Sequence, residues 1–517
     1  MSMQSDTRQS ESSAPADRVY DVIVLGAGPV GQTVAARTRS AGLSVALVER
    51  ELVGGECSYW GCVPSKALLR PVLAIADARR IDGAREAIRD KIDVAGVFGR
   101  RDRYVTNWHD AGQANTVAEM GVELIRGHAR LDGTRRVRVV SADQRADHLT
   151  ARHAVVICTG STAAVPDIPG MAGANPWTNR KGTDSSTVPT RLAVVGGGGV
   201  GVEMATAWQG LGSQVTLLAR TPRLLPRMEP FVGDFVARGL FDAGVDVRVG
   251  VNITKLQRSA DSGPVDVTLD CGDHVVVDEI LFATGRTPNT GDIGVETVGL
   301  TPGGWLDVDD SCLVRGVDET WLYALGDVNH CVLLTHQGKY QARVAANVIT
   351  ARARGDVVDT APWGTYVTTA DSKAVPQAFF TDPEAGSVGL TADAAEQLGF
   401  RIKTVDVNIG DVVTGANLYA DGYTGQARLV IDLDDGVLLG ASFVGPGVAE
   451  LLHSATIAVA GRVPVDRLWH AVPCFPTISE VWLRLLEAHR DTDGEGPTFV
   501  SPKKLGQSCE LSSSVTT

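Results

Sequence analysis

The chain has 517 residues, of which 44% are hydrophobic and 21% are charged, and its formal net charge at pH 7 is −13. A chain of this length is expected to fold as several domains with separate cores, and the acidic excess argues against a nucleic-acid partner. The sequence contains no run of eighteen apolar residues, so it predicts neither a membrane span nor a signal peptide, and we expect a cytoplasmic protein.

The first predicted element is a nucleotide-binding unit that follows a polar tail. A strand, a turn, a helix and a second strand are expected between Val19 and Arg50, and the turn reads Gly26-Ala27-Gly28-Pro29-Val30-Gly31. Glycines at this spacing allow a tight turn and close approach of the backbone to a pyrophosphate at the helix N-terminus. Glu49 lies 18 residues after Gly31, where a carboxylate can accept hydrogen bonds from a ribose. We interpret this unit as the FAD site.

Two neighbouring cysteines, Cys57 and Cys62, come directly after this unit. Residues five apart in a regular helix have Cα atoms about 8.6 Å apart, whereas a disulfide tolerates at most about 7 Å. The backbone must therefore be distorted if the two sulfurs bond, and Gly54, Gly55 and Gly61 supply the freedom for this. Zinc binding is disfavoured because no second ligand pair follows at a suitable spacing. A redox dithiol is the main interpretation, and an inert pair of thiols is the alternative.

The other six cysteines are isolated in the sequence, and eight cysteines are too few for a disulfide scaffold in a chain of this length. We expect these six to be buried thiols. They are Cys158, Cys271, Cys312, Cys331, Cys474 and Cys509.

A second nucleotide-binding unit is predicted from Leu192 to Arg220, so that one dinucleotide fold is inserted into another. Its turn is Gly196-Gly197-Gly198-Gly199-Val200-Gly201, and the position of the ribose acid holds Ala219, followed by Arg220. A basic residue here can neutralise a 2′-phosphate, and Arg223 and Arg227 add positive charge nearby, so NADPH is favoured over NADH. The alternative is that Arg220 is an ordinary surface residue.

From about Thr365 the pattern changes to strand-like alternation at 377–380, 427–432 and 437–445, followed by an apolar helical stretch at 449–460. The expected fold class is therefore α/β, with two Rossmann-like dinucleotide-binding domains, for FAD and NAD(P), and a C-terminal α+β domain. The expected boundaries are a disordered tail 1–18, the FAD-binding domain 19–188, the NAD(P)-binding domain 189–288, a return segment of the FAD domain 289–364, the C-terminal domain 365–489 and a flexible tail 490–517.

The segment from Gly54 to Lys66 resembles the redox-active helix of the class I pyridine nucleotide-disulfide oxidoreductases, the family of dihydrolipoamide dehydrogenase, glutathione reductase and mercuric reductase. The resemblance covers about 20–487, and its further matching segments are Thr159-Gly160, Ala283-Thr284-Gly285-Arg286, Ala324-Leu325-Gly326-Asp327 and Phe380-Thr381-Asp382-Pro383-Glu384. It implies a flavoenzyme that is active as a homodimer, whose dimerisation domain begins at the last of these segments.

The resemblance also implies roles for individual residues. Cys62 lies against the flavin, Cys57 exchanges with the substrate, Lys66 approaches flavin N5, Glu203 pairs with Lys66, and Asp327 binds the ribityl chain. The predicted catalytic residues are Cys57, Cys62, Lys66, Glu203 and Glu480. The predicted FAD-binding residues are Gly26, Gly28, Pro29, Gly31, Glu49, Arg50, Gly55, Cys62, Lys66, Ala129, Thr159, Gly160, Gly326, Asp327, Thr335 and His336. The predicted NAD(P)-binding residues are Gly196, Gly198, Gly201, Glu203, Arg220 and Gly285. No metal site is predicted.

One position departs from the family pattern. Disulfide reductases of this family carry a His-Pro-Thr segment followed by Glu, whereas this chain has Phe475 in the place of the histidine and retains Glu480. The missing general base is typically worth about a hundred- to ten-thousand-fold in rate. His470, His336 and Cys474 are possible substitutes, and none is favoured over a packing or surface role.

Three other residues have open interpretations. Tyr59 and Trp60, between the two cysteines, either narrow the substrate pocket or pack against the flavin or the partner. A single tail cysteine, Cys509, is interpreted as incidental.

The sequence is consistent with three alternative functions. The first is an NADPH-dependent flavoenzyme that passes electrons through FAD and the Cys57/Cys62 dithiol to a disulfide. The second is a reductase of a non-disulfide acceptor, such as a quinone, oxygen or a soft metal ion, as the presence of Phe475 suggests. The third is a flavin-binding subunit without turnover.

Overall fold

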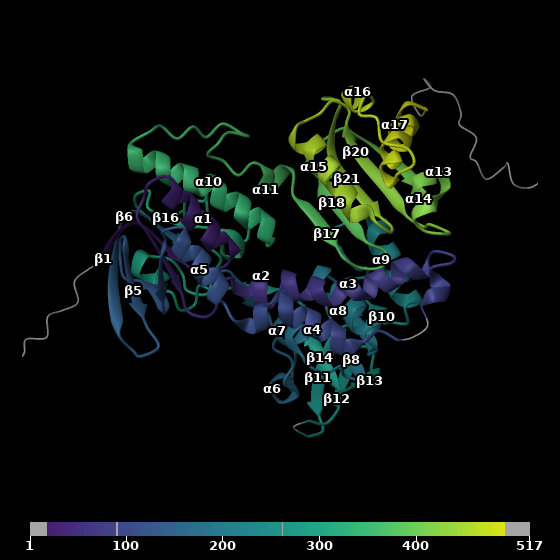
Figure 1. The fold of residues 1–517 in the computed structure, drawn as a ribbon, viewed down its shortest axis with the longest axis horizontal. Coiled ribbons are helices and arrows are strands. Elements are labelled where there is room, and N and C mark those ends of the chain that lie inside the picture. Colours follow the sequence, from purple (N-terminus) through teal and green to yellow (C-terminus); the bar gives the residue numbers. More distant parts are fainter. Residues whose placement is uncertain (1–17, 89–90, 261, 492–517) are drawn as a thin grey trace, which may run out of the picture. The chain divides into compact units, whose positions relative to one another are not determined.

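The computed structural model describes residues 18–88, 91–260 and 262–491, which form two compact units (Figure 1). Unit one falls within 1–57, 109–162 and 287–368, and unit two within 58–108, 163–286 and 369–517. The predicted tails at 1–18 and 490–517 lie almost wholly outside the described residues, and so does Cys509. Three short elements lie where the chain passes between the units: α2 (Gly55–Tyr59), β7 (Ser161–Ala163) and β15 (Arg286–Pro288).

Unit one contains the first nucleotide fold around a seven-stranded sheet, in which β3, β2, β1 and β6 are parallel neighbours, β16 pairs with β6, and β5 and β4 extend the sheet antiparallel. The long helix α10 packs against α1 (Figure 1). Its elements are β1 (Arg18–Leu25), α1 (Pro29–Ser40), β2 (Val45–Glu49), α5 (Ala111–Glu119), β3 (Glu123–Arg126), β4 (His128–Leu131), β5 (Arg136–Val140), β6 (Ala146–Ile157), η3 (Val295–Val298), β16 (Leu322–Ala324), η4 (Gly326–Asn329) and α10 (Thr335–Arg354).

The central strands of this sheet are apolar on both faces, as parallel strands covered on two sides require. Val22 and Val24 of β1 pack in one cluster with Ala342 of α10. Ile23 and Leu25, which point to the opposite face, pack in a second cluster with Trp321. The carboxyl ends of β1 and of the strands parallel to it therefore lie at one edge of the sheet, where the turn after β1 begins.

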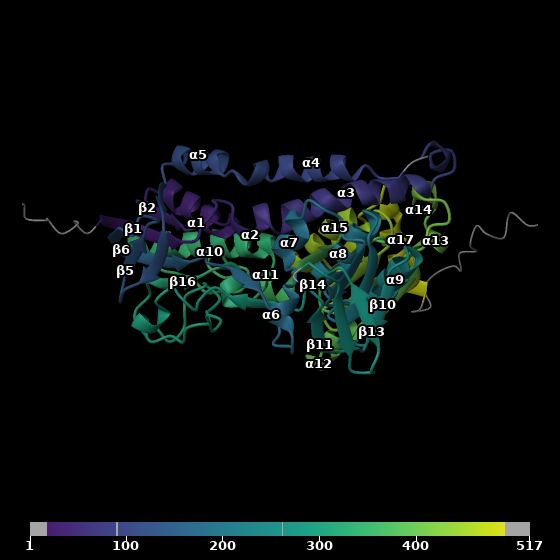
Figure 2. The ribbon, with the colours of Figure 1, turned by 90° about the horizontal axis from the view of Figure 1, so that it is seen from below.

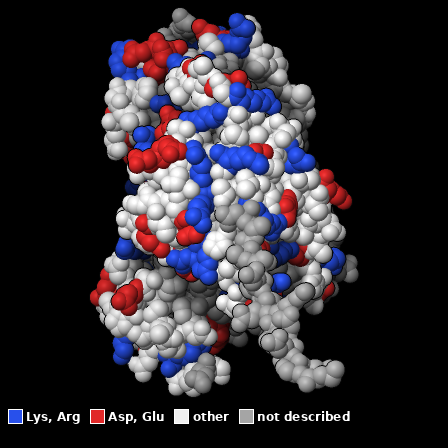
Figure 3. Space-filling view, turned by 90° about the vertical axis from the view of Figure 1, so that its left-hand side faces the viewer, with Lys and Arg blue, Asp and Glu red and all other residues white. Residues whose placement is uncertain are grey.

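Charged side chains of both signs are mixed on unit one. Figure 3, which faces the side of Figure 1 where β1 and β5 are labelled, shows blue and red side chains interspersed. Ion pairs here join Arg18 to Glu123 and Arg135 to Glu319. Exposed pairs of this kind contribute little to stability.

Unit two begins with helices that follow the dithiol. Helix α3 packs against α4, and Figures 1 and 2 both show the two side by side. The elements of this region are α3 (Cys62–Arg79), η1 (Arg85–Ala87), α4 (Val94–Tyr104), η2 (Thr106–Trp108), α6 (Met171–Ala174) and α7 (Asn179–Asp184).

The second nucleotide fold has a parallel sheet in the order β10-β9-β8-β14 and an antiparallel sheet in the order β11-β12-β13. Its elements are β8 (Arg191–Val195), α8 (Gly199–Gly210), β9 (Gln214–Ala219), α9 (Pro230–Asp242), β10 (Asp246–Val249), β11 (Ile253–Arg258), β12 (Val265–Leu269), β13 (His274–Val277) and β14 (Glu279–Phe282).

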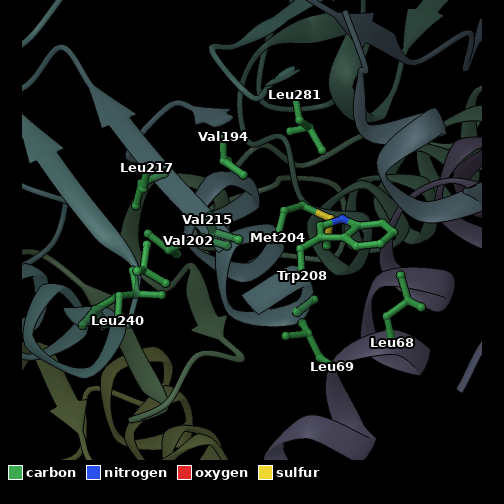
Figure 4. Close-up of a cluster of buried hydrophobic side chains, with 14 of the residues drawn as sticks. Leu68, Leu69, Val194, Val202, Met204, Trp208, Val215, Leu217, Leu240 and Leu281 are labelled. Atoms are coloured by element: carbon green, nitrogen blue, oxygen red, sulfur yellow. The ribbon is translucent and has the colours of Figure 1, made fainter. Parts of the chain in front are cut away.

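Helix α3 packs onto α8 through a buried apolar cluster. Leu68 and Leu69 of α3 lie beside Met204 and Trp208 of α8 (Figure 4), and Trp208 is fully buried. This contact brings the helix that begins at Cys62 against the helix of the second fingerprint.

The C-terminal part of unit two is an antiparallel sheet in the order β17-β18-β21-β20-β19, as the alternating sequence predicted. Helices α15 and α17 share its core. Its elements are α11 (Ala370–Lys373), β17 (Pro376–Phe379), β18 (Ala385–Gly389), α12 (Ala392–Gln397), β19 (Ile402–Asn408), α13 (Ile409–Val412), α14 (Thr414–Tyr419), β20 (Gln426–Asp432), β21 (Val437–Val444), η5 (Val448–Leu451), α15 (Leu452–Ala460), α16 (Val465–Leu468), η6 (Ile478–Glu480) and α17 (Val481–Asp491).

The expectation for the isolated cysteines is partly wrong. Cys158 and Cys312 are buried, whereas Cys271, Cys331 and Cys474 are exposed, because they lie in turns and loops. Among the described helices, none is both long and apolar enough to cross a bilayer.

Candidate active site

The first glycine fingerprint forms a turn in which two positions exclude any side chain. Gly26 follows β1 with a φ of +101°, and a Cβ atom there would lie 2.4 Å from the carbonyl oxygen of Cys158. A Cβ atom on Gly31 would lie 1.9 Å from the carbonyl oxygen of Gly26. The space around Gly28, the N-cap of α1, is open, since a Cβ atom there would meet nothing within 4 Å. The turn thus leaves an accessible helix N-terminus, which suits a pyrophosphate.

Glu49 ends β2 and is held by the backbone of this turn. Its Oε2 accepts a hydrogen bond from Ala27 N at 2.7 Å, and its Oε1 accepts one from Glu51 N at 2.8 Å. The side chain is buried, with 9% exposed. A carboxylate oxygen can accept more than one hydrogen bond, so Glu49 is fixed in place and still able to bind ribose hydroxyls.

Other predicted flavin residues lie in unit one, and one of them has a buried polar atom that lacks a partner within the part of the chain that the structure describes. Among the described residues, Thr159 Oγ1 is buried without a hydrogen-bond partner. Asp327 Oδ2 accepts a hydrogen bond from Ser161 Oγ at 2.5 Å, and Gly326 N donates to Gln341 Oε1 at 2.7 Å. A buried hydroxyl without a partner is costly, and a bound polar ligand would relieve this cost.

The remaining predicted flavin residues lie on several elements of unit one. Ala129 is buried in β4, and Arg50 is exposed directly after β2. Thr335 and His336 open α10, where Thr335 is half-buried and His336 is exposed.

The dithiol spans a break between two helices. Cys57 is half-buried in α2, and Cys62 is the exposed first residue of α3. Gly54 and Gly55 adopt φ angles of +124° and +57°, and Gly61, the N-cap of α3, has φ −124° and ψ −113°. Two separate helices, interrupted at Gly61, therefore replace a single regular helix across the two cysteines.

Lys66 and Glu203 meet where α3 packs on α8. Lys66 Nζ lies 2.6 Å from Glu203 Oε2, and Glu203 Oε1 accepts a hydrogen bond from Phe380 N at 3.1 Å. The Lys66 ammonium lies 5.2 Å from the centre of the Phe380 ring. The structure thus brings together the two residues of the predicted pair, and it adds Phe380 to them.

The second fingerprint repeats the geometry of the first. Gly196 has a φ of +125°, and a Cβ atom on Gly201 would lie 1.8 Å from the carbonyl oxygen of Gly196. Gly198, the N-cap of α8, is open, because a Cβ atom there would meet nothing within 4 Å.

This fingerprint borders a cavity of about 800 Å³ within unit two. Arg220 and Arg227 line it, as does Gly285, whereas Arg223 is not among the lining residues. None of these three arginines has a carboxylate partner within the described ranges. Gln377 and Phe379 of β17 complete the wall. The sequence predicted this strand but carried no signal that would place it at the second fingerprint.

The C-terminal segment in which Phe475 stands in the place of the expected histidine also lies in unit two. Glu480 is buried, and its Oε1 accepts a hydrogen bond from Arg484 Nη2 at 2.5 Å, while its Oε2 has no partner among the described residues. Phe475 is 73% exposed, and His470 and Cys474 are exposed nearby in the sequence. His336, the third possible substitute, belongs to unit one. Arg484 was not predicted, although its spacing of four residues from Glu480 is typical of a helical ion pair.

Comparisons with known proteins agree with this arrangement. Residues 20–355 match the family model described as pyridine nucleotide-disulphide oxidoreductase, and residues 375–486 match the dimerisation domain of the same family. A mercuric reductase from Staphylococcus aureus is 28% identical over 480 residues, which cover 92% of this chain and 84% of that protein. A dihydrolipoyl dehydrogenase from Haloferax volcanii is 30% identical over 476 residues, which cover 90% and 95%.

The fold is also similar to that of a solved structure. The Cu(II) complex of the HOCl-induced flavoprotein disulfide reductase RclA from Escherichia coli aligns with a TM-score of 0.77 at 24% identity, covering 91% of this chain and 99% of that one.

Proposed function

Because the chain belongs to the pyridine nucleotide-disulphide oxidoreductase family, we propose that it passes electrons from NADPH through FAD to the Cys57/Cys62 dithiol and on to a disulfide acceptor. The protein is a flavoprotein enzyme, and its family uses FAD and NAD(P)H. The match to the dimerisation domain supports a homodimer. The observation that carries the proposal is that Cys62 begins α3 and Lys66, one turn later, is paired with Glu203 of the coenzyme fold.

The residues of unit one fit FAD. The open space at Gly28, the anchored carboxylate of Glu49 and the buried hydroxyl of Thr159 suit a pyrophosphate, a ribose and a further polar group of one extended ligand. Bound FAD supplies a carrier that accepts a hydride and passes two electrons to a disulfide. We assign to it Gly26, Gly28, Pro29, Gly31, Glu49, Arg50, Gly55, Cys62, Lys66, Ala129, Thr159, Gly160, Gly326, Asp327, Thr335 and His336.

The chain's own groups would orient the dithiol and favour the thiolate form of Cys62. A helix N-terminus favours the thiolate form of a cysteine, and Cys62 occupies that position in α3. Glu203, with its side chain 7% exposed, holds the Lys66 ammonium, whose side chain is 37% exposed. Lys66 thereby keeps a fixed positive charge one turn from Cys62, and Cys57 is left to exchange with the acceptor.

NADPH is the proposed coenzyme because the cavity beside the second fingerprint carries two arginines and no ribose acid. Arg220 and Arg227 line this cavity, and Ala219 occupies the acidic position of NAD sites. We assign to the coenzyme Gly196, Gly198, Gly201, Glu203, Arg220 and Gly285. The domain boundaries and the cytoplasmic location expected from the sequence are retained as proposals.

A second candidate acceptor is favoured by Phe475. A phenyl ring cannot protonate a leaving thiolate, whereas reduction of a quinone, oxygen or a soft metal ion releases no thiolate that must be protonated. Resemblance to a mercuric reductase, and to a flavoprotein solved as a Cu(II) complex, supports the metal-ion version of this candidate. A flavin-binding subunit without turnover is the third candidate.

An acceptor screen separates the three functions. Purified holoenzyme is supplied with NADPH and, in turn, with low-molecular-weight disulfides, quinones and metal ions. Turnover with a disulfide that is lost in Cys57→Ser supports the proposal. Turnover with a quinone that Cys57→Ser retains, without any disulfide turnover, supports the second candidate. Failure to consume NADPH with every acceptor, despite bound flavin, supports the third.

A further inference from the structure

Trp60, which lies between the two cysteines, packs inside unit two. Its side chain is buried, with 9% exposed. The indole lies 5.8 Å from the ring of Tyr59, and the Arg180 guanidinium lies 4.0 Å from its centre. Arg180 belongs to α7, so this short helix covers the break between α2 and α3.

The break has a cause in the sequence. In a continuous helix the carbonyl of Trp60 would accept a hydrogen bond from the backbone N–H four residues later, but that residue is Pro64. Proline has no N–H, and its ring clashes with the carbonyl four residues before it. The Trp60 carbonyl is therefore turned out of the helix and needs another donor.

Helix α7 places two donor groups at this carbonyl. Asn179 Nδ2 donates to Trp60 O at 2.9 Å, and Thr183 Oγ1 lies 3.3 Å from Trp60 O and shares its single hydroxyl hydrogen with the carbonyl of Asn179 at 2.9 Å. Both side chains are buried, with 9% and 2% exposed. We call Asn179, Arg180 and Thr183 the α7 clamp, because all three contact Trp60.

The α7 clamp is itself anchored to neighbouring elements of unit two. Arg101 of α4 donates to the carbonyls of Thr183 at 3.0 Å and Ser185 at 2.6 Å. Trp208 of α8 donates to the carbonyl of Gly182 at 3.2 Å. The clamp therefore holds Trp60 against the buried framework formed by α4 and α8.

We propose that the α7 clamp positions the chain between Cys57 and Cys62 for disulfide formation and thereby sets the reduction potential of the dithiol. A regular helix would keep the two Cα atoms about 8.6 Å apart, beyond the roughly 7 Å limit for a disulfide. The clamp holds the broken conformation while both cysteines are reduced. This inference rests on the proposed function, and its residues are positioning residues that act through Trp60.

The direction of the effect follows from preorganisation. A clamped break keeps the two thiols close, so little conformational freedom is lost when the sulfurs bond. Without the clamp the segment samples other conformations, and the disulfide becomes less favourable. We expect the equilibrium constant for disulfide formation to fall about tenfold, which for this two-electron couple raises the reduction potential by about 30 mV.

The test measures this equilibrium in the holoenzyme under anaerobic conditions. The protein is equilibrated in mixtures of reduced glutathione and glutathione disulfide. The Cys57 and Cys62 thiols lose two electrons and two protons as their S–S bond forms, and glutathione disulfide takes up both and is cleaved to two molecules of glutathione. Acid quenching, alkylation and peptide mass spectrometry then give the fraction of the Cys57–Cys62 disulfide.

Two variants loosen the clamp, and a third is the matched control. The double variant Asn179→Ala/Thr183→Val removes both donors to Trp60, and Arg180→Met removes the stacked guanidinium but keeps an unbranched side chain. Lys181→Met makes the same kind of change at the next residue of α7, which is exposed and pairs only weakly with Asp184 at 3.8 Å. Thermal unfolding of each variant reports on the fold separately.

We expect the equilibrium constant for disulfide formation to fall about tenfold in Asn179→Ala/Thr183→Val and to fall less in Arg180→Met. In Lys181→Met it should equal the wild-type constant. A lower melting temperature with an unchanged constant in both clamp variants would overturn the inference, because the residues would then be structural only. If wild-type protein forms no Cys57–Cys62 disulfide in any glutathione mixture, the proposed function fails instead.

Discussion

Lys66 Nζ lies 2.6 Å from Glu203 Oε2, and this pair joins the helix that begins at Cys62 to the helix of the second glycine fingerprint. Phe380 N donates to the other oxygen of Glu203 at 3.1 Å, so the carboxylate is held from two sides. The position of the Lys66 charge therefore depends on the nearly buried Glu203.

Replacement of Glu203 by Gln should slow flavin reduction by NADPH about ten- to hundredfold, since a hydrogen bond to a charged group is worth about 1.5–3 kcal/mol. Stopped-flow absorbance of the flavin measures this rate. Glu279→Gln is the control, because Glu279 also pairs with a buried cation, Arg258, at 2.8 Å. Flavin reduction at the wild-type rate in Glu203→Gln would show that the pair has no part in this step.

Arg220→Ala should lower kcat/KM for NADPH about ten- to hundredfold and leave the value for NADH nearly unchanged, because we assign to Arg220 a contact with the 2′-phosphate, which NADH lacks. Steady-state kinetics with both coenzymes test this. Arg223→Ala removes the same charge from the same loop but not from the cavity, and it should have a much smaller effect. Equal losses with NADPH and NADH would contradict the assignment of Arg220.

Gly28→Ala should keep the fold and weaken FAD binding about tenfold or more, equivalent to about 1.4 kcal/mol. The added methyl group would meet no protein atom within 4 Å, so a loss of affinity would identify space that the ligand occupies. Equilibrium titration of apoprotein with FAD gives the affinity. Gly112→Ala, in α5 of the same unit and equally open, serves as the control. Unchanged FAD affinity in Gly28→Ala would place the flavin elsewhere.

Phe475→His should raise kcat/KM for disulfide acceptors about ten- to hundredfold, because an imidazole would supply the missing proton donor and acceptor. The gain should fall as the pH rises through about 6.5, because the imidazole then loses the proton that it would give to the leaving thiolate. Phe475→Leu should give no gain. A pH-independent rate equal to that of wild type would show that a histidine at this position does not restore the missing proton donor.

The parts of the fold that local sequence encodes were predictable. Gly26 and Gly31 lie where only a hydrogen atom fits, so the spacing of the glycines identified both turns. The strand expected at 377–380 is found at Pro376–Phe379, one residue earlier at each end, although its side chains are all half-buried and do not alternate.

Contacts between distant segments could not be predicted in this way. Asn179 binds the Trp60 carbonyl from 119 residues away, and no local pattern signals such a contact. Phe379 lines the cavity beside the second fingerprint because β17 lies there, and this position depends on tertiary packing. The exposure of Cys271 likewise follows from its turn and not from the general tendency of cysteine to be buried.

The central claim, that reduction by NADPH ends at a dithiol next to the flavin, is tested most directly by anaerobic titration of the holoenzyme with one equivalent of NADPH. The account predicts a long-wavelength absorbance band that appears in the wild-type protein on reduction, that is already present in Cys57→Ser before NADPH is added, and that is absent from Cys62→Ser. Reduction of the wild-type flavin without that band, or a band of equal strength in Cys62→Ser, would contradict it.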